Sequence, residues 1–412
     1  MKKAQRLRYY AESLCIYNFE EDDAFTALID MLLDDGDDMV AMQSCFFREL
    51  AECGSLKEHI SRLILTNDNI FTRKACAGEA GELPISIINA VKSDLSKLEE
   101  LSSLTAQDII EIVDDDDVKE ILLTMPGWDT GKALAPLDKG WDKSIDRLAE
   151  YHKENGYGIF AKSTAFSLRD EELCPVASVD PITLNDLKNY EIQRQKVIDN
   201  TQSFIEGHPA NNVLLYGDRG TGKSSTVHAI LNEYSKMGLR MIEIPKSAVA
   251  DLSLIREKIA GSPLKFIIYI DDLSFDSNDN SFKELKAALE GSLSGKQPNT
   301  LIYATSNRRH LIKENFSDRE NDVNKSDTMQ EQLSLSDRFG LSITFLNPDK
   351  ANYLDIVEKI AIDRGLDSRV DMEQLCYMAE RWATRRGGRS PRCAKQFIDF
   401  VEGCENSGRS WQ

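Results

Sequence analysis

The sequence predicts an α/β fold with a parallel sheet, a mainly helical region before it and a small set of helices after it. Three observations support this prediction. A short apolar run, Val213 to Tyr216, reads as a buried strand that breaks at a glycine-rich turn and continues into helical spacing. Two further apolar runs, 264–275 and 299–307, are separated by a helical segment, and strands that alternate with helices are typical of parallel sheets. The first of these runs is nearly continuous, as in strands buried on both faces.

Length and charge limit the function classes. A chain of 412 residues is too long for one ordinary core, so we expect three domains: a mainly helical N-terminal domain (1–175), an α/β core (176–347) and a C-terminal helical segment (348–412). The formal net charge of -19 disfavours nonspecific nucleic-acid binding, which depends on Lys and Arg. The basic N-terminus lacks the apolar stretch of a signal peptide, and no apolar run could cross a bilayer. A cytoplasmic protein without membrane contact is therefore expected.

The N-terminal region shows helical spacing but no chemical motif. Two acidic clusters, 34–38 and 114–117, lack the spaced ligands of a calcium loop and are interpreted as solvated turns or helix ends. A connection without regular structure is expected at 156–181, with the domain boundary near Pro175. The helical segments are predicted at 22–33, 55–65, 83–104, 107–113 and 141–152.

The glycine-rich turn matches the phosphate-binding P-loop pattern, Gly-x-x-x-x-Gly-Lys-Ser. Glycines permit unusual dihedral angles, so that successive N–H groups can surround phosphate oxygens at the start of a helix. Lys223 is expected to reach the β- and γ-phosphates, and the Ser224 hydroxyl to bind Mg²⁺. The alternative is a glycine-rich turn that fits by chance. The predicted phosphate-binding residues are Gly217, Asp218, Arg219, Gly220, Thr221, Gly222, Lys223, Ser224 and Ser225.

Polar residues follow two of the predicted strands. Asp271 and Asp272 end the first run and Asn307 ends the second. Ligands of parallel α/β sheets bind at the carboxyl ends of strands, so these residues and the P-loop are expected to share one site. Two more short strands are predicted, one at 238–246 after the P-loop helix and one at 341–346 after a polar segment at 314–332, and the remainder is helical.

Five segments in order, GDRGTGKSS, FIIYIDDLSF, YATSNRRHL, LSLSDRFG and GRSPRCAKQF, resemble the Walker A, Walker B, sensor 1, arginine finger and sensor 2 motifs of AAA+ ATPases. The chain more closely resembles the bacterial AAA+ proteins grouped as domain-of-unknown-function family 815, mainly from Ile182 to Phe400. This resemblance implies an AAA+ P-loop core, a C-terminal helical lid at 348–412, ATP and Mg²⁺ as cofactors, and ATP hydrolysis. It also implies that the strip Leu184 to Tyr190 covers the adenine base.

The resemblance implies a role for each polar group. Asp271 would hold Mg²⁺ through its water shell, and Asp272 would orient or deprotonate the attacking water, which Asn307 also holds. Most AAA+ proteins have Glu where this chain has Asp272, and a shorter side chain favours slow turnover. A helix cap is the alternative for Asp272 and a turn residue for Asn307.

Two arginines complete the expected site. Arg338 stands at the arginine-finger position, which acts on the nucleotide of a neighbouring subunit and so implies a homo-oligomer. Its alternative is a structural ion pair. Arg392, at the sensor 2 position, would reach the γ-phosphate from the lid.

Two functions are weighed most heavily. One is an ATP-hydrolysing machine that remodels or regulates an unidentified protein partner. The other is a slow or non-hydrolysing nucleotide-gated binding module or loader, including one that acts on nucleic-acid-bound partners. A small-molecule kinase would leave Asn307, Arg338 and Arg392 unexplained. Direct action on nucleic acid is the weaker alternative because of the acidic charge.

Overall fold

The computed structural model describes residues 3–33, 38–138, 140–274, 280–290, 297–307 and 338–411. The chain forms two compact units. The first comprises residues 1–163 with 262–264, and the second comprises residues 164–261 and 265–412. None of the helices in the described ranges is long and apolar enough to cross a lipid bilayer.

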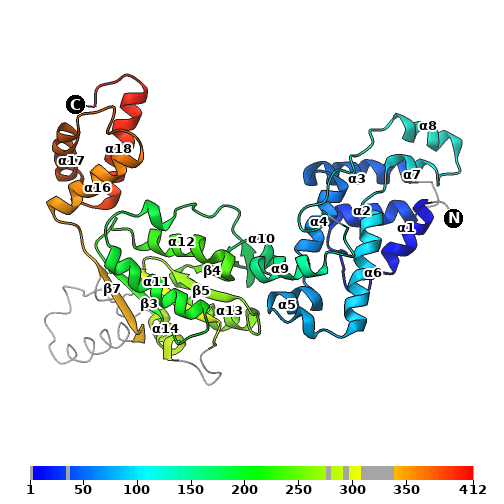
Figure 1. Cartoon of the computed structure of the whole chain (residues 1–412), viewed down its shortest axis with the longest axis horizontal. Coiled ribbons are helices and arrows are strands. Elements are labelled where there is room, and N and C mark those ends of the chain that lie inside the picture. The colour runs from blue at the N-terminus through cyan, green and yellow to red at the C-terminus, as the bar shows by residue number, and fades with distance from the viewer. Residues whose placement is uncertain are drawn as a thin grey trace. The chain divides into compact units, whose positions relative to one another are not determined.

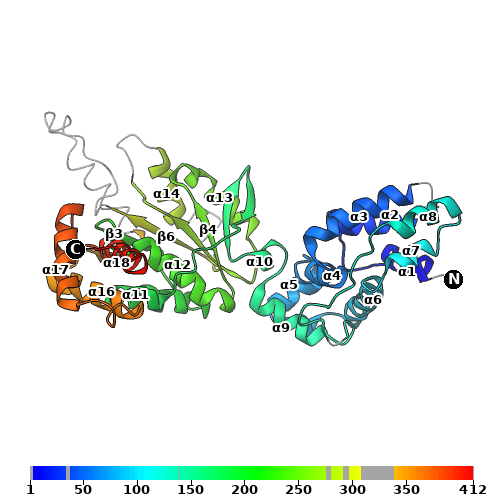
Figure 2. The same ribbon diagram turned by 90° about the horizontal axis from the view of Figure 1, so that it is seen from above.

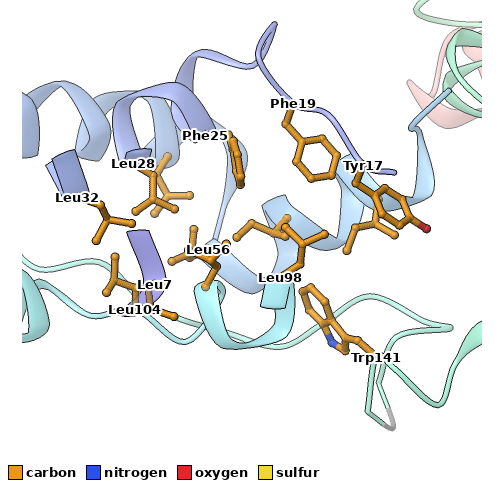
Figure 3. Packing of buried hydrophobic residues seen from close by; sticks show 14 of the residues in the cluster. Leu7, Tyr17, Phe19, Phe25, Leu28, Leu32, Leu56, Leu98, Leu104 and Trp141 are labelled. Carbon is orange, nitrogen blue, oxygen red and sulfur yellow. The ribbon is translucent and has the colours of Figure 1, made fainter. Parts of the chain in front are cut away.

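The first unit is helical, as predicted, and its helices surround one hydrophobic core (Figures 1 and 3). Figure 3 shows aliphatic side chains from distant helices, such as Leu7, Leu56 and Leu98, pointing toward one another beside the rings of Phe25 and Trp141. The helices are α1 (Lys3–Glu12), α2 (Asp23–Leu33), α3 (Met39–Cys53), α4 (Leu56–Leu65), α5 (Ile70–Cys76), the 3-10 helix η1 (Ala80–Glu82), α6 (Ile85–Leu101), α7 (Ala106–Ile110), α8 (Asp116–Thr124), α9 (Ile145–Asn155) and α10 (Ile159–Lys162).

Acidic side chains in this unit have structural partners. Asp115 caps α8 by accepting hydrogen bonds from the backbone N–H groups of Asp117 and Val118, which confirms the interpretation of the 114–117 cluster as a helix end. Most of the other cluster, residues 34–37, lies outside the described residues. Asp94, on α6, is fully buried, and its Oδ2 accepts the N–H groups of Cys15, Ile16 and Tyr17 at 2.9, 2.7 and 3.3 Å. Asp94 thereby fixes the turn that follows α1.

The second unit contains a seven-stranded sheet in the order β2-β1-β4-β5-β6-β3-β7. All pairs are parallel except β1 with β2. The strand before the P-loop, β3, lies between β6 and β7, so the carboxyl ends of these three strands meet at one edge. The five strands that the sequence predicts are present as β3 (Val213–Gly217), β4 (Leu239–Ile244), β5 (Lys265–Ile270), β6 (Thr300–Ser306) and β7 (Leu341–Phe345).

Two strands lie where the sequence predicted an irregular connection. β1 (Ala165–Arg169) and β2 (Glu172–Pro175) form a hairpin, and β1 extends the parallel sheet beside β4. The second unit therefore begins at residue 164, ahead of the expected boundary at 175. The hairpin turn consists of Asp170 and Glu171, both with positive φ (48° and 64°). Glycine or asparagine usually marks such a turn, so the sequence carried no hairpin signal.

Helices cover both faces of the sheet (Figures 1 and 2). α11 (Glu191–Ile205) and α12 (Lys223–Tyr234) pack on one face, where Val197 and Val227 contact the strands, and the other face carries α13 (Leu252–Lys258) and α14 (Asn280–Glu290). Every residue of β6 is buried. Short 3-10 helices connect these elements: η2 (Leu184–Asp186), η3 (Ser235–Met237) and η4 (Lys246–Asp251).

The C-terminal helices have a hydrophobic cluster of their own, with Tyr353, Leu375 and Phe397 fully or almost fully buried. They are α16 (Lys350–Asp363), α17 (Met372–Arg386) and α18 (Pro391–Asn406), which agrees with the helical spacing predicted after residue 348. Ser390 caps α18 and Pro391 occupies its first turn.

Candidate nucleotide-binding site

The loop between β3 and α12 has the backbone that a phosphate cradle requires. Gly217, Gly220 and Gly222 have φ values of 134°, 76° and 94°, in the region that L side chains rarely adopt. A Cβ atom at Gly217 would lie 2.0 Å from the carbonyl oxygen of Phe345 on the neighbouring strand β7. Glycine is therefore required at residue 217 both by conformation and by space.

Lys223, the first residue of α12, connects the loop to the strand ends. Its Nζ donates hydrogen bonds to the carbonyl oxygens of Gly217 and Asp218 at 2.9 and 2.7 Å and to Asn307 Oδ1 at 3.2 Å. Burial lowers the pKa of Lys223, against the opposing effect of nearby carboxylates such as Asp218. A desolvated ammonium group held only by neutral oxygens is suited to bind an anion.

Asn307 links Lys223 to the acidic pair. Its Nδ2 donates to Asp272 Oδ1 at 2.6 Å, so Lys223, Asn307 and Asp272 form one chain of hydrogen bonds. The backbone of Asp272 is left-handed (φ 48°), and its N–H donates to Thr305 Oγ1 at 3.0 Å. The two residues that follow it, 273 and 274, are not helical, so Asp272 does not cap a helix at this point.

The neighbouring Asp271 accepts three hydroxyl hydrogen bonds at one oxygen. Oδ1 lies 2.8 Å from Ser224 Oγ, 2.6 Å from Tyr269 Oη and 2.5 Å from Thr305 Oγ1. Burial opposes ionisation of Asp271, but these hydrogen bonds outweigh burial and lower its pKa below the ordinary 3.8. The carboxylate is therefore held in its charged form beside the P-loop.

The residues at this point fit a magnesium ion. Mg²⁺ prefers hard oxygen ligands and takes few of them from protein, because it keeps several waters. Ser224 Oγ and the Asp271 carboxylate already lie within hydrogen-bonding distance of each other at the loop. The donor set of one hydroxyl and one carboxylate matches the predicted metal ligands.

The start of α18 contacts the P-loop. The N–H of Arg392 donates to the carbonyl oxygen of Gly220 at 3.1 Å, and a Cβ at Gly220 would lie 3.0 Å from Ser390 Oγ. A cavity of about 310 Å³ opens there, with Arg219 and Arg392 in its lining. A second cavity of about 370 Å³ lies at the ends of β3, β6 and β7, with Asp218 and Asn307 in its lining.

A family described as "Protein of unknown function (DUF815)" matches residues 161–405, more than half of the chain. The chain belongs to this family.

Other proteins are similar to this DUF815 protein over only part of the chain. The large subunit of replication factor C from Nanoarchaeum equitans is 31% identical over 100 residues, which span 23% of this chain and 23% of that protein. Among solved structures, the Holliday junction branch migration motor RuvB of Thermotoga maritima aligns with a TM-score of 0.39 at 17% identity, over 56% of this chain and 67% of RuvB. A mutant form of the same RuvB aligns with a TM-score of 0.40 at 18% identity and the same coverage. With a mostly parallel sheet and a glycine-rich loop between β3 and α12, the DUF815 protein has a P-loop α/β fold.

The site of the DUF815 protein brings together most of the residues that the sequence singled out. Hydrogen bonds join Lys223, Asn307 and Asp272 in one group and Ser224 with Asp271 in another, and Thr305 connects the two groups. The expected arginine finger, Arg338, lies just before the buried Phe339 and β7. The earlier residues of its motif, 333–337, lie outside the described residues. The same holds for residues 308–310 and for the polar segment 314–332. The role of Arg338 concerns a second copy and stays a prediction.

Two polar residues of the site were not anticipated. The sequence predicts Tyr269 and Thr305 only as strand residues, but both donate to Asp271. The two-residue repeat of a strand places Tyr269 and Asp271 on the same side, and the register of β5 with β6 pairs Ile270 with Ala304. The alternation was visible in the sequence, whereas the register was not.

The strip expected over adenine has an unusual backbone. Asn189 and Tyr190 are both left-handed, with φ of 64° and 63°, and the Tyr190 hydroxyl donates to the carbonyl oxygen of Leu346 at 2.6 Å. The Tyr190 ring also lies 5.2 Å from the ring of Phe345. Asparagine tolerates this conformation better than most residues do. The strip is anchored to the end of β7.

Proposed function

We propose that this DUF815 protein binds ATP with Mg²⁺ at the P-loop and hydrolyses it to remodel or regulate a protein partner. The observation that supports this best is the hydrogen-bonded set of Lys223, Asn307, Asp272, Asp271 and Ser224 at the carboxyl edge of the sheet. A cation, a metal-ligand pair and the Asp272 carboxylate lie within one site. Phosphoryl transfer needs positioning and charge stabilisation from such groups.

Each residue has a proposed task. The loop from Gly217 to Ser225 surrounds the phosphates, and Lys223 leaves its carbonyl partners to bind the β- and γ-phosphates. Ser224 and Asp271 would hold Mg²⁺, which when bound neutralises charge on the phosphate oxygens. Asp272 accepts a proton from the attacking water or orients that water. Asn307 keeps both the Asp272 carboxylate and the water in position.

Two arginines act on the transferring phosphate in this proposal. Arg392 reaches it from α18, whose first turn already contacts Gly220. Arg338 acts on the nucleotide of a second copy, so the active form is a homo-oligomer. The three-part division, with the α/β core up to residue 347 and a lid from 348, and a cytoplasmic location are parts of the same proposal.

Phosphate release by the full chain tests the function. We expect Lys223→Ala to lower the rate by about 100-fold or more, because a preorganised cation at the phosphates is lost. Arg338→Ala should lower it by roughly 10³-fold. Lys236→Ala is a matched control, since this exposed lysine follows α12 and should keep the wild-type rate. Equal rates for wild type and Lys223→Ala would reject ATP hydrolysis at this loop.

A second candidate is a slow or non-hydrolysing nucleotide-gated module or loader. Asp272 favours it, because its side chain is short and one oxygen is already bound to the Asn307 amide at 2.6 Å. Single-turnover and steady-state measurements separate the candidates. Turnover well above one ATP per second per subunit, without any partner, would contradict the slow module.

A protein partner is favoured over nucleic acid because the chain carries a net charge of -19. The names of two relatives, replication factor C and a Holliday junction motor, indicate that those proteins act in DNA transactions. Affinity capture with an Asp272→Ala variant held with ATP, compared with Lys223→Ala, would identify the partner. Salt-dependent retention of DNA in a shift assay would favour nucleic acid instead.

A further inference from the structure

The charged side chains that line the cavity between the P-loop and the C-terminal helices are all positive. Arg219 of the loop, Arg386 at the end of α17 and Arg392 at the start of α18 all line it. The other lining residues are neutral, including Ser390, Asn347 and Gln396, and none of them is Asp or Glu. In a chain with 69 acidic and 50 basic residues, three arginines without a carboxylate form an unusual local excess of positive charge.

The three arginines differ from two arginines next to the C-terminal helices, Arg364 and Arg389, which are held in ion pairs. Arg389 binds Glu380 with more than one nitrogen, and Arg364 binds Asp399 and Glu402 at 2.6 and 2.8 Å. Among the described residues, no ion pair is formed by Arg219, Arg386 or Arg392. Their guanidinium groups therefore keep donors available for an anion in the cavity.

Arg386 is held in place by aromatic rings. Its Cζ lies 4.7 Å from the centre of the Trp382 ring, which in turn stacks on Phe400 at 5.1 Å and 27°. Contact with a ring face orients a guanidinium and leaves its N–H edge uncovered. Gly387 and Gly388 follow with positive φ (88° and 141°), so the chain turns directly from Arg386 toward Ser390.

We propose that Arg219 and Arg386 form a phosphate subsite next to Arg392 and bind the polyphosphate chain of the nucleotide. This inference rests on the proposed function; it adds Arg386 as a ligand-binding residue and gives the side chain of Arg219, already in the proposed loop, a specific task. Bidentate guanidinium groups match the geometry of phosphate oxygens. Because the arginines come from the loop, from α17 and from α18, a bound polyphosphate connects both C-terminal helices to the P-loop.

Titration of the full chain with a fluorescent ATP analogue, and competition by inorganic tripolyphosphate, test the subsite. We expect Arg386→Ala and Arg219→Ala to weaken binding of both ligands roughly 10- to 100-fold, as the loss of a charge-assisted hydrogen bond does. Arg386→Lys should lie between wild type and Arg386→Ala. Arg385→Ala is the matched control: Arg385 is exposed on the same helix but does not line the cavity, so its affinity should stay within about twofold of wild type.

Thermal unfolding of each variant shows whether the fold persists, and Arg386→Gln keeps the length of the side chain if the alanine variant unfolds. Wild-type affinity in Arg386→Ala and Arg386→Gln, or equal losses in Arg385→Ala, would overturn the subsite while Lys223→Ala still fails to bind. If wild type binds neither ligand, the proposed function and the subsite fall together.

Discussion

Two carboxylates in different units each have an oxygen that accepts three hydrogen bonds. Asp94, in the helical unit, accepts three backbone N–H groups around Ile16. Asp271, in the α/β unit, accepts three hydroxyl groups, from Ser224, Tyr269 and Thr305. The same number of hydrogen bonds therefore occurs in two different chemical settings.

The two carboxylates differ in the kind of hydrogen-bond donor that each one accepts. Backbone N–H groups at Asp94 cannot turn away, so the carboxylate fixes the turn after α1, deep in the core. Hydroxyl groups at Asp271 rotate and have lone pairs of their own, so Ser224 can release its hydrogen bond and bind a metal. We infer that a carboxylate oxygen with three donors stabilises the fold when the donors are backbone N–H groups, and prepares a ligand site when they are side-chain hydroxyls beside a P-loop.

In the comparison of the two carboxylates, the largest expected effect comes from Asp271→Asn. The amide oxygen still accepts the three hydroxyl hydrogen bonds, but the charge that would hold Mg²⁺ is gone. We expect ATP hydrolysis to fall by about 100-fold or more, with little change in the midpoint of thermal unfolding. Phosphate release and a melting curve measure both quantities. A stable variant with the wild-type rate would remove Asp271 from the proposed mechanism.

We expect Asp94→Ala to lower stability and to leave activity unchanged, the reverse of Asp271→Asn. Three buried N–H groups lose their acceptor, and we expect the free energy of unfolding to fall by about 3 kcal/mol, while hydrolysis per folded molecule is retained. Urea denaturation provides the measurement. Asp116→Ala is the control, because that side chain is 95% exposed. If Asp94→Ala lost activity without losing stability, the assignment of the two carboxylates would be reversed.

Tyr269→Phe sharpens the comparison within the site. Removal of the Tyr269 hydroxyl leaves the Asp271 carboxylate less firmly oriented. Loss of a group that hydrogen-bonds to a metal ligand typically lowers metal affinity by about 10-fold or more. We therefore expect a roughly 10-fold higher Mg²⁺ concentration for half-maximal hydrolysis. The control is Tyr303→Phe, on the paired position of β6, where the lost hydrogen bond goes to Thr201. A Mg²⁺ requirement that is unchanged in Tyr269→Phe, or equally raised in both variants, would contradict the assignment.

The smallest expected effect is on acid stability. Because the pKa of Asp271 is lowered in the folded state, its ionised form stabilises the fold fully above about pH 3.8, and this contribution is lost as pH falls through the lowered value. Thr305→Val removes the largest of the hydrogen-bond effects that lower the pKa of Asp271, so the loss should move to higher pH. Titration of the Asp271 carboxyl by NMR checks the direction. A lower pKa in Thr305→Val would contradict this account.

The sequence predicted the parts that depend on local pattern. The spacing of Gly217, Gly220 and Gly222 reflects backbone conformations that only glycine adopts easily, so the P-loop was identified from the sequence. The five strands that carry the site were apolar enough to be recognised. The roles of the site residues were predicted by resemblance, and the experiments above are needed to test them.

The parts that depend on register or on unusual turns were not predicted. Tyr269 and Thr305 are ordinary strand residues until the pairing of β5 with β6 brings them to Asp271. Helix α3 was missed because its apolar residues are mixed with polar ones and Asp38 makes no side-chain cap. The association of Arg386 with the P-loop follows from tertiary packing, which a linear pattern does not contain.

The hydrogen bond from the Arg392 N–H to the Gly220 carbonyl has a consequence for motion. If a ligand displaces the tip of the loop, the first turn of α18 must either follow it or give up this bond. Amide hydrogen exchange at Arg392 would then change when the loop is occupied, even though the amide itself touches no ligand. One backbone amide can thus report the state of the pocket from the far end of the chain.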